Sequence, residues 1–211
     1  MPKVFVIAIL AFCSSGLRAQ YTGYELLTQT EHFKKSFSTA TSSLESIKSD
    51  FIQEKNLSLL SEKITSTGKF WYKRKERVRM EYQQPYYYLL MLNQGKIIIK
   101  DGQKESKFSA ASNKVFQQVN QILLDCVSGN VLDNPDFQYR VFESGSSWLI
   151  ELTPSSKNLQ KLYKNIRIQL DKKDYSAKSI EMVEVSGDNT VIRFQNKELN
   201  GQIPDSVFIY P

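Results

Sequence analysis

The feature that most restricts the fold is a period of two in the hydrophobic pattern, which runs from about Ser49 to the C-terminus. Alternating apolar and polar residues predict strands that bury one face, because successive side chains of a strand point to opposite sides. Turn sequences separate the segments, for example Asn-Gln-Gly at 93–95 and Asp-Gly at 101–102. We therefore predict a mainly β protein with about 11 short antiparallel strands. Besides a strand that begins at Phe51, the predicted strands cover residues 64–72, 77–82, 87–92, 96–100, 104–108, 137–142, 147–152, 165–170, 179–185, 190–196 and 206–210.

Two stretches instead place apolar residues at steps of three and four, the spacing of one helix face. The first follows a capping-box pair, Thr22 and Glu25, and predicts an N-terminal helix that runs to about residue 46. The second begins with Ser112 as a cap, ends before Gly129, and could cover the open end or the concave face of a curved sheet. A short helix near 157–161 would add to that cover. The apolar stripe of the second helix consists of Val115, Phe116, Val119, Ile122, Leu123 and Cys126.

Residues 1–19 have the three parts of a secretory signal peptide: a positive start with Lys3, an apolar run over 4–12, and a small residue, Ala19, at the cleavage point. We predict that residues 20–211 form a single domain, because no linker or repeat interrupts the strands. A rival interpretation makes Cys13 a lipidated cysteine, although Phe12 is bulky where that signal normally has a small residue.

The sequence contains one histidine, two cysteines and none of the common catalytic motifs. His32 lies on the predicted N-terminal helix, where a solvent-exposed histidine is more common than a catalytic one. We therefore predict no enzyme activity, no metal and no cofactor. The main electrostatic feature is a basic run, either a solvated face or a docking patch for an acidic partner or anionic lipid head groups. That run consists of Lys69, Lys73, Arg74, Lys75, Arg77 and Arg79.

An ordered series of short motifs resembles a known family. The series begins with Phe-Ile-Gln at 51–53, continues with Gly-Lys-Phe-Trp-Tyr-Lys-Arg at 68–74 and Val-Arg-Met-Glu-Tyr at 78–82, and ends with Pro85 and Gln-Gly-Lys at 94–96. It is similar to the periplasmic outer-membrane lipoprotein carriers, the LolA family, from about Leu44 to the C-terminus. The resemblance implies an incompletely closed antiparallel β-barrel with an N-terminal helix and a helical lid over an apolar cavity.

The same resemblance implies a function. The chain would bind the acyl chains of lipoproteins and shuttle them through the periplasm from an inner-membrane lipoprotein-releasing transporter to an outer-membrane acceptor. We expect a monomer without stable membrane insertion and without nucleic acid as a partner. The expected lid residues are Phe116, Val119, Ile122 and Leu123. The residues expected to line the acyl-chain cavity are Phe51, Phe70, Tyr72, Val78, Met80, Tyr82, Leu90, Leu92, Trp148 and Ile150.

Arg74 matches the position of the arginine that secures the lid in this family. The family has a proline next to it, where this chain has Lys75. Three other functions stay open. The chain could be the outer-membrane lipoprotein receptor, which lipidation at Cys13 would favour, or a carrier for another lipid or a pigment precursor. A lipid acyl-hydrolase would need a nucleophile and base that the sequence does not offer.

Overall fold

The computed structural model describes residues 21–102, 104–109, 122, 125 and 129–210. The helices with described bounds are the α-helices α1 (Glu31–Ser42) and α3 (Lys157–Gln160) and the short 3-10 helices η2 (Asn130–Leu132) and η3 (Asp205–Phe208). The strands are β1 (Glu25–Leu26), β2 (Ser46–Leu57), β3 (Glu62–Lys73), β4 (Arg77–Gln84), β5 (Tyr88–Asn93), β6 (Lys96–Asp101), β7 (Lys104–Ser109), β8 (Phe137–Glu143), β9 (Ser147–Pro154), β10 (Tyr163–Asp171), β11 (Ala177–Glu184) and β12 (Asn189–Leu199).

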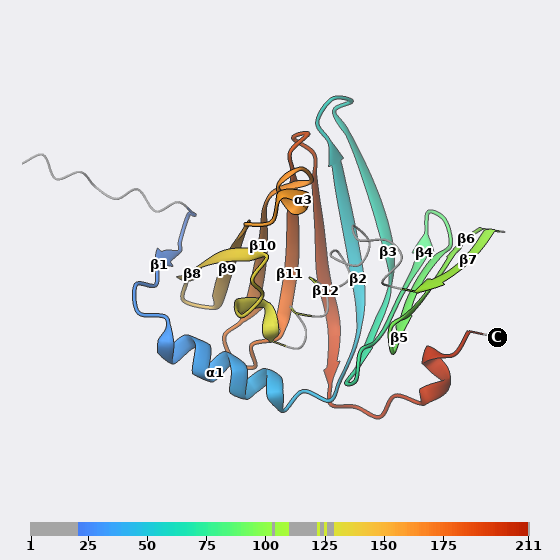
Figure 1. Cartoon of the computed structure of the whole chain (residues 1–211), viewed down its shortest axis with the longest axis horizontal. Coiled ribbons are helices and arrows are strands. Elements are labelled where there is room, and N and C mark those ends of the chain that lie inside the picture. The colour runs from blue at the N-terminus through green and yellow to red at the C-terminus, as the bar shows by residue number, and fades with distance from the viewer. Residues whose placement is uncertain (1–20, 103, 110–121, 123–124, 126–128, 211) are drawn as a thin grey trace, which may run out of the picture.

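These strands form one curved antiparallel sheet in the order β1-β8-β9-β10-β11-β12-β2-β3-β4-β5-β6-β7. Within the described residues, β1 and β7 are the two edges and do not pair with each other, so the sheet stays open. Figure 1 shows α1 beside the β8–β11 side, and η3 beside β4 and β5 on the other side. The predicted fold, an incompletely closed antiparallel β-barrel of about 11 strands, is therefore confirmed. No helix in the described part of the chain is long and apolar enough to span a membrane.

In β3 and β4 the alternation in the sequence correctly indicates which face is buried. Phe70 pairs with Met80 and Tyr72 pairs with Val78 across β3 and β4, and all four side chains are buried. Strand β5 departs from the pattern, because residues 89–92 are buried on both faces. Its outer face lies beside η3, where Phe208 is buried and its carbonyl oxygen accepts a 3.0 Å hydrogen bond from Asn93 Nδ2.

Buried apolar side chains form two clusters on the same face of the sheet, one over β8–β11 and one over β12 and β2–β6, and Ile180 of the first pairs with Ile192 of the second. Met182 and Phe194 pack against both. The α1 cluster consists of Phe33, Phe37, Ile122, Val131, Leu132, Phe137, Val141, Ile150, Leu152, Leu159, Ile166, Ile168, Leu170 and Ile180. The β3 cluster consists of Leu44, Ile47, Phe51, Phe70, Tyr72, Val78, Met80, Leu90, Leu92, Ile97 and Ile192.

The N-terminal helix begins later than predicted, at Glu31 rather than directly after Thr22. Residues 22–25 form a turn and the start of β1, which pairs with β8. Two tyrosines before the helix explain the extended chain: Tyr24 Oη lies 2.6 Å from Ser147 Oγ, and Tyr21 donates a hydrogen bond to Glu151. These contacts with β9 hold the segment on the sheet and override the capping-box pattern. The helical spacing of Phe33 and Phe37 was correct, since both are buried against the sheet.

Several predicted features fall outside the described residues. The signal peptide over 1–19 and most of the second predicted helix lie there, including Phe116, Val119 and Leu123 of the expected lid. Ile122 and Asp125 are described; both are helical and buried, and Ile122 belongs to the α1 cluster. The lid therefore stays a prediction.

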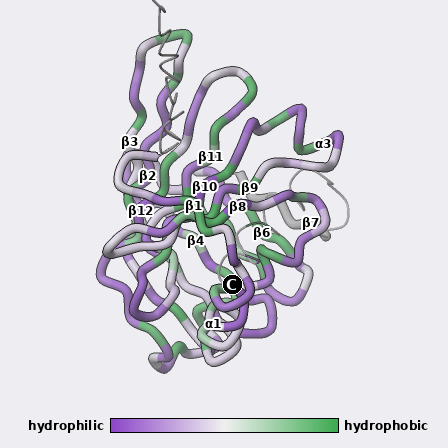
Figure 2. The backbone as a smooth tube through the Cα atoms, turned by 90° about the vertical axis from the view of Figure 1, so that its left-hand side faces the viewer, coloured by the Kyte–Doolittle hydropathy of each residue, from purple (hydrophilic) through white to green (hydrophobic). Residues whose placement is uncertain are grey.

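Two local features shape the β2–β3 hairpin. An added Cβ at Gly68 would lie 2.1 Å from the Glu81 carbonyl oxygen and 2.7 Å from the Phe51 ring, so only glycine lets β4 and that ring approach so closely. The Phe51 ring in turn meets the Tyr82 ring edge-to-face, with centroids 4.9 Å apart. The far end of the hairpin projects beyond the other described parts of the chain (Figure 2), and its tip exposes Leu59 and Leu60.

Candidate functional site

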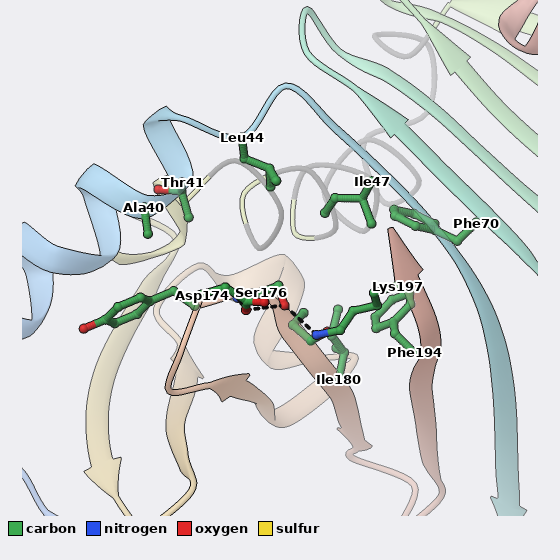
Figure 3. Close-up of a pocket in the computed structure, with 12 residues that line it drawn as sticks. Ala40, Thr41, Leu44, Ile47, Phe70, Asp174, Ser176, Ile180, Phe194 and Lys197 are labelled. Carbon is green, nitrogen blue, oxygen red and sulfur yellow. Dashed lines mark hydrogen bonds between the residues drawn. The ribbon is translucent and has the colours of Figure 1, made fainter. Parts of the chain in front are cut away.

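An apolar pocket lies at the boundary of the two clusters. It is bounded by the end of α1, the beginning of β2, β3, the β10–β11 turn and β12 (Figure 3). The free space at its centre is about 30 Å³, whereas pockets that hold drug-sized ligands usually measure about 300–1,000 Å³. The pocket is therefore nearly closed, and a lipid chain could enter only if its walls moved apart. Its lining residues are Ala40, Thr41, Leu44, Ile47, Phe70, Asp174, Tyr175, Ser176, Ala177, Ile180, Phe194 and Lys197.

The walls of this pocket are mostly apolar. Leu44 and Ile47 come from the chain that links α1 to β2 and from the start of β2, and Figure 3 shows them facing Ser176 and Ile180 across the pocket. Phe70 from β3 and Phe194 from β12 pack together with ring centroids 5.3 Å apart. Such a lining suits a ligand made of hydrocarbon, which gains about 0.8 kcal/mol for each methylene removed from water.

One corner of the pocket is polar. Lys197 Nζ donates hydrogen bonds to Ser176 Oγ at 2.5 Å and to the Ala177 carbonyl oxygen at 3.2 Å. Ser176 Oγ in turn donates to Asp174 Oδ1 at 2.6 Å. Burial lowers the pKa of the Lys197 amine, and the nearby carboxylates of Asp174 and Asp171 oppose that shift. A partly buried ammonium group therefore stands in an otherwise apolar cavity.

A β-bulge places Lys197 in that corner. In the β12–β2 ladder, Gln195 pairs with Asp50 and Glu198 pairs with Lys48, so two residues of β12 stand opposite Ser49 alone. Asn196, the first of the two, has a φ of 52°, a left-handed conformation that asparagine tolerates well. Bulges redirect side chains, and this one breaks the alternation that would otherwise point residue 196 inward.

Arg74 directly follows β3 and links that strand to the end of α1. Its Nε donates to the Leu44 carbonyl oxygen at 3.1 Å, and its Nη2 donates to the carbonyl oxygens of Thr41, at 3.3 Å, and Ser42. The Glu45 carboxylate lies 3.2 Å from Nε. The last carbonyls of a helix have no partner within the helix, and a guanidinium group can satisfy several of them at once. Arg74 thus fastens the wall that carries Leu44.

The turn after Arg74 explains the residue that follows it. Lys75 has a φ of 70° and Glu76 a φ of 54°. Proline holds φ near about −65°, so it could not occupy position 75 in this turn. The basic run around it is largely paired: Lys69 with Asp50, Lys73 and Arg77 with Asp205, and Arg79 with Glu81.

The residues expected to line the cavity are divided between the clusters. Trp148 and Ile150 belong to or pack against the α1 cluster, and the other eight belong to or pack against the β3 cluster. Of the ten, Phe70 alone lines the described pocket, and the others stay predicted cavity residues. Sequence analysis missed Leu44, Ile47, Phe194 and Lys197 as pocket residues. Leu44 fell within the predicted N-terminal helix, which was expected to run to about residue 46 but ends at Ser42.

The described residues include no group of three or more His, Cys, Asp or Glu side chains that could hold a metal ion. His32 is exposed on α1. The titratable side chains among the described lining residues of the pocket are Lys197, Asp174 and Tyr175.

Solved structures that superimpose with TM-scores of 0.50 or more have the same fold as this chain. An uncharacterized conserved protein from Thermus thermophilus superimposes with a TM-score of 0.53 at 6% identity, over 87% of this chain and 95% of that one. The structure of the Pseudomonas aeruginosa MucA/MucB complex superimposes with a TM-score of 0.50 at 13% identity, and the alignment covers 85% of this chain and 60% of that one. A LolA superfamily protein from Nitrosomonas europaea has a TM-score of 0.44 at 10% identity, and the alignment covers 84% of this chain and 97% of that one.

None of the curated protein sequences matches this chain. The family described as outer membrane lipoprotein carrier protein LolA, in contrast, matches residues 42–211, from the end of α1 to the C-terminus. The matched region contains every strand from β2 to β12, Arg74 and most of the pocket lining. This chain therefore belongs to the LolA family of outer membrane lipoprotein carrier proteins.

Proposed function

We propose that this protein binds the acyl chains of lipoproteins and carries them through the periplasm, from a lipoprotein-releasing transporter in the inner membrane to an acceptor at the outer membrane. The family name supports the class of cargo. The observation that carries the proposal is the nearly closed apolar pocket between α1 and the open sheet, fastened by Arg74.

The energetics of lipid transfer require such a device. A lipidated protein exposes long hydrocarbon chains, and each methylene left in water costs about 0.8 kcal/mol. A carrier must cover those chains with an apolar surface and must also release them. A pocket that closes when empty competes with the cargo, since opening it costs free energy that binding must supply. The small volume of the pocket and the bonds from Arg74 to the end of α1 suit that closed state.

Binding of a tripalmitoylated peptide tests this function, with the same peptide lacking its acyl chains as the reference. The wild-type protein should bind the acylated peptide and should not bind the peptide without acyl chains. Ile47→Glu places a carboxylate in the pocket wall and should reduce that binding at least about tenfold, because an unpaired buried charge is strongly unfavourable. Ile64→Glu is the matched control, since Ile64 lies on the same hairpin with its side chain 44% exposed.

Circular dichroism would establish that both variants are folded before binding is measured. Equal binding of the acylated peptide by folded Ile47→Glu and by the wild type would refute the pocket as the acyl-chain site. Failure of the wild-type protein to bind the acylated peptide would refute the carrier function itself.

A further inference from the structure

Binding an acyl chain requires only apolar walls, whereas one corner of this pocket is polar and carries a charge. Lys197 has three amine hydrogens to donate and uses two of them on Ser176 Oγ and the Ala177 carbonyl oxygen. Both acceptors are uncharged. Among the described residues, no carboxylate lies within ion-pair distance of this amine, although Asp174 is bonded to the same serine hydroxyl. The ammonium group therefore has one donor left, and the Asp174 carboxylate, which also lines the pocket, is connected to it only through Ser176.

The surrounding backbone supports a binding role for this charge. The bulge at residues 196–197 brings the lysine to the inner face, and bulges are common beside functional sites. Ser49, the residue opposite the bulge, shares its face of β2 with Ile47 and Phe51. Its Oγ atom is buried and has no hydrogen-bond partner in the described part of the chain. A buried hydroxyl without a partner is costly, so a ligand oxygen near it would remove a penalty.

We infer that Lys197 binds the anionic head group of a lipid, a carboxylate or a phosphate, whose hydrocarbon chain lies against Leu44, Ile47 and Phe70. The inference rests on the proposed function and narrows its cargo: the pocket would discriminate between acidic and neutral amphiphiles of equal chain length. The Asp174 carboxylate reaches this partly buried ammonium group only through Ser176, so an anion beside the amine supplies a direct ionic partner and an acceptor for the third hydrogen. A neutral head group would supply an acceptor only.

The test compares three ligands with hydrocarbon chains of equal length: palmitate, 1-palmitoyl lysophosphatidate and the neutral alcohol hexadecanol. Each displaces a fluorescent lipid probe from the wild-type protein, below its critical micelle concentration. We expect at least one of the two anions to bind about tenfold or more tightly than hexadecanol, the size of one charge-assisted hydrogen bond. The ratio of palmitate to lysophosphatidate affinity identifies the preferred anion as a carboxylate or a phosphate.

Three variants assign the preference to the lysine. Lys197→Met keeps most of the side-chain volume without the charge and should bind all three ligands with similar affinity. Lys197→Arg keeps the charge and should retain a preference for an anion. Lys164→Met is the matched control, because Lys164 is an exposed lysine on β10, and it should behave as the wild type does.

Equal binding of hexadecanol and both anions by the wild type would overturn the inference, whatever the variants do, and would leave the carrier function intact. An anion preference that survives in Lys197→Met would overturn it as well. If the wild-type protein bound none of the three ligands or the acylated peptide, the proposed function and this inference would both fall.

Discussion

The two hydrophobic clusters differ in the exposure of their most deeply buried side chains. In the α1 cluster, Ile150, Leu152, Ile166, Ile168 and Leu170 all have 0% exposed surface. In the β3 cluster the lowest exposure is 1%, at Phe51 and Ile97, whereas the edges of the two clusters are similar: Leu44 at 8% and Leu90 at 9%, against Leu132 at 7% and Phe137 at 8% in the α1 cluster. The difference suggests a division of labour: the α1 cluster is a fixed scaffold, and the β3 cluster forms a surface that can separate from α1 and accept a ligand.

Truncating one leucine in each cluster tests this division and should give the largest effect. Leu152→Ala should lower the free energy of unfolding by about 2–5 kcal/mol, because a fully packed site cannot collapse around the cavity. Leu90→Ala removes the same atoms from a less sealed site, and its loss of stability should be smaller by about 1 kcal/mol or more. Urea denaturation measures both.

The cargo response separates the clusters further. Leu90→Ala should alter binding of an acylated peptide, whereas Leu152→Ala, at a temperature where it is folded, should bind it as the wild type does. Equal losses of stability together with equal effects on binding would show that the protein has one uniform core.

Sequence patterns predicted the β3 cluster well, because residues such as Phe70, Val78 and Met80 alternate within strands that pair in order. The pocket was harder to predict, since it needs the end of a helix, a turn between β10 and β11, and a bulge to meet in space. The bulge is the clearest example. Strict alternation places residue 196 on the inner face, and a single backbone irregularity brings Lys197 there instead.

The start of α1 shows a second limit of local patterns. Thr22 and Glu25 have the spacing of a helix cap, but Tyr21 and Tyr24 bind side chains of β9 that are 130 and 123 residues away in sequence. Contacts between residues so far apart in the sequence leave no recognisable pattern in the local sequence. Arg74 was singled out because it matches the arginine that secures the lid in the LolA family, and the structure adds what it contacts: the carbonyl groups at the end of α1.

Arg74 connects the two regions, so its removal should change how they move relative to each other. Arg74→Leu loses charge-assisted hydrogen bonds to the end of α1, and we expect a cost of about 1–2 kcal/mol, reduced because the side chain is partly exposed. Hydrogen exchange of the amides over residues 41–47 should become roughly tenfold faster, since about 1.4 kcal/mol is a factor of ten.

The same variant should retain acylated cargo and release it slowly, because the closed form that competes with the cargo is weakened. Arg193→Leu is the matched control: Arg193 pairs with Glu54 on the exposed surface of β12 and β2, away from α1. Unchanged exchange over residues 41–47 in Arg74→Leu would mean that the arginine does not hold the two regions together.

A rise to alkaline pH should also distinguish the two clusters, through the ionisation of their buried tyrosines. This effect should be the smallest of those predicted. Burial raises the pKa of Tyr72, Tyr82 and Tyr88, which all lie on the β3 side, whereas the α1 side has Tyr163. A phenol whose pKa is raised in the folded state stays neutral there while the unfolded chain ionises. The contribution of these tyrosines to the free energy of unfolding is therefore fully present below about pH 10. It is lost as the pH rises above that value, by up to about 1.4 kcal/mol per pH unit for each such group.

The two tryptophans of the chain allow each side to be followed separately, since Trp71 lies on β3 and Trp148 packs against the α1 cluster. With Trp148→Phe, the fluorescence of Trp71 reports the β3 side; with Trp71→Phe, Trp148 reports the other. Between about pH 8 and pH 11 we expect the Trp71 signal to change first. Tyr82→Phe should reduce the alkaline loss of stability by about 1 kcal/mol, because phenylalanine cannot ionise, while Tyr86→Phe, at an exposed site, should not. Simultaneous changes at both tryptophans, unaffected by Tyr82→Phe, would show that the two clusters unfold as one unit and that the sheet does not open on the β3 side first.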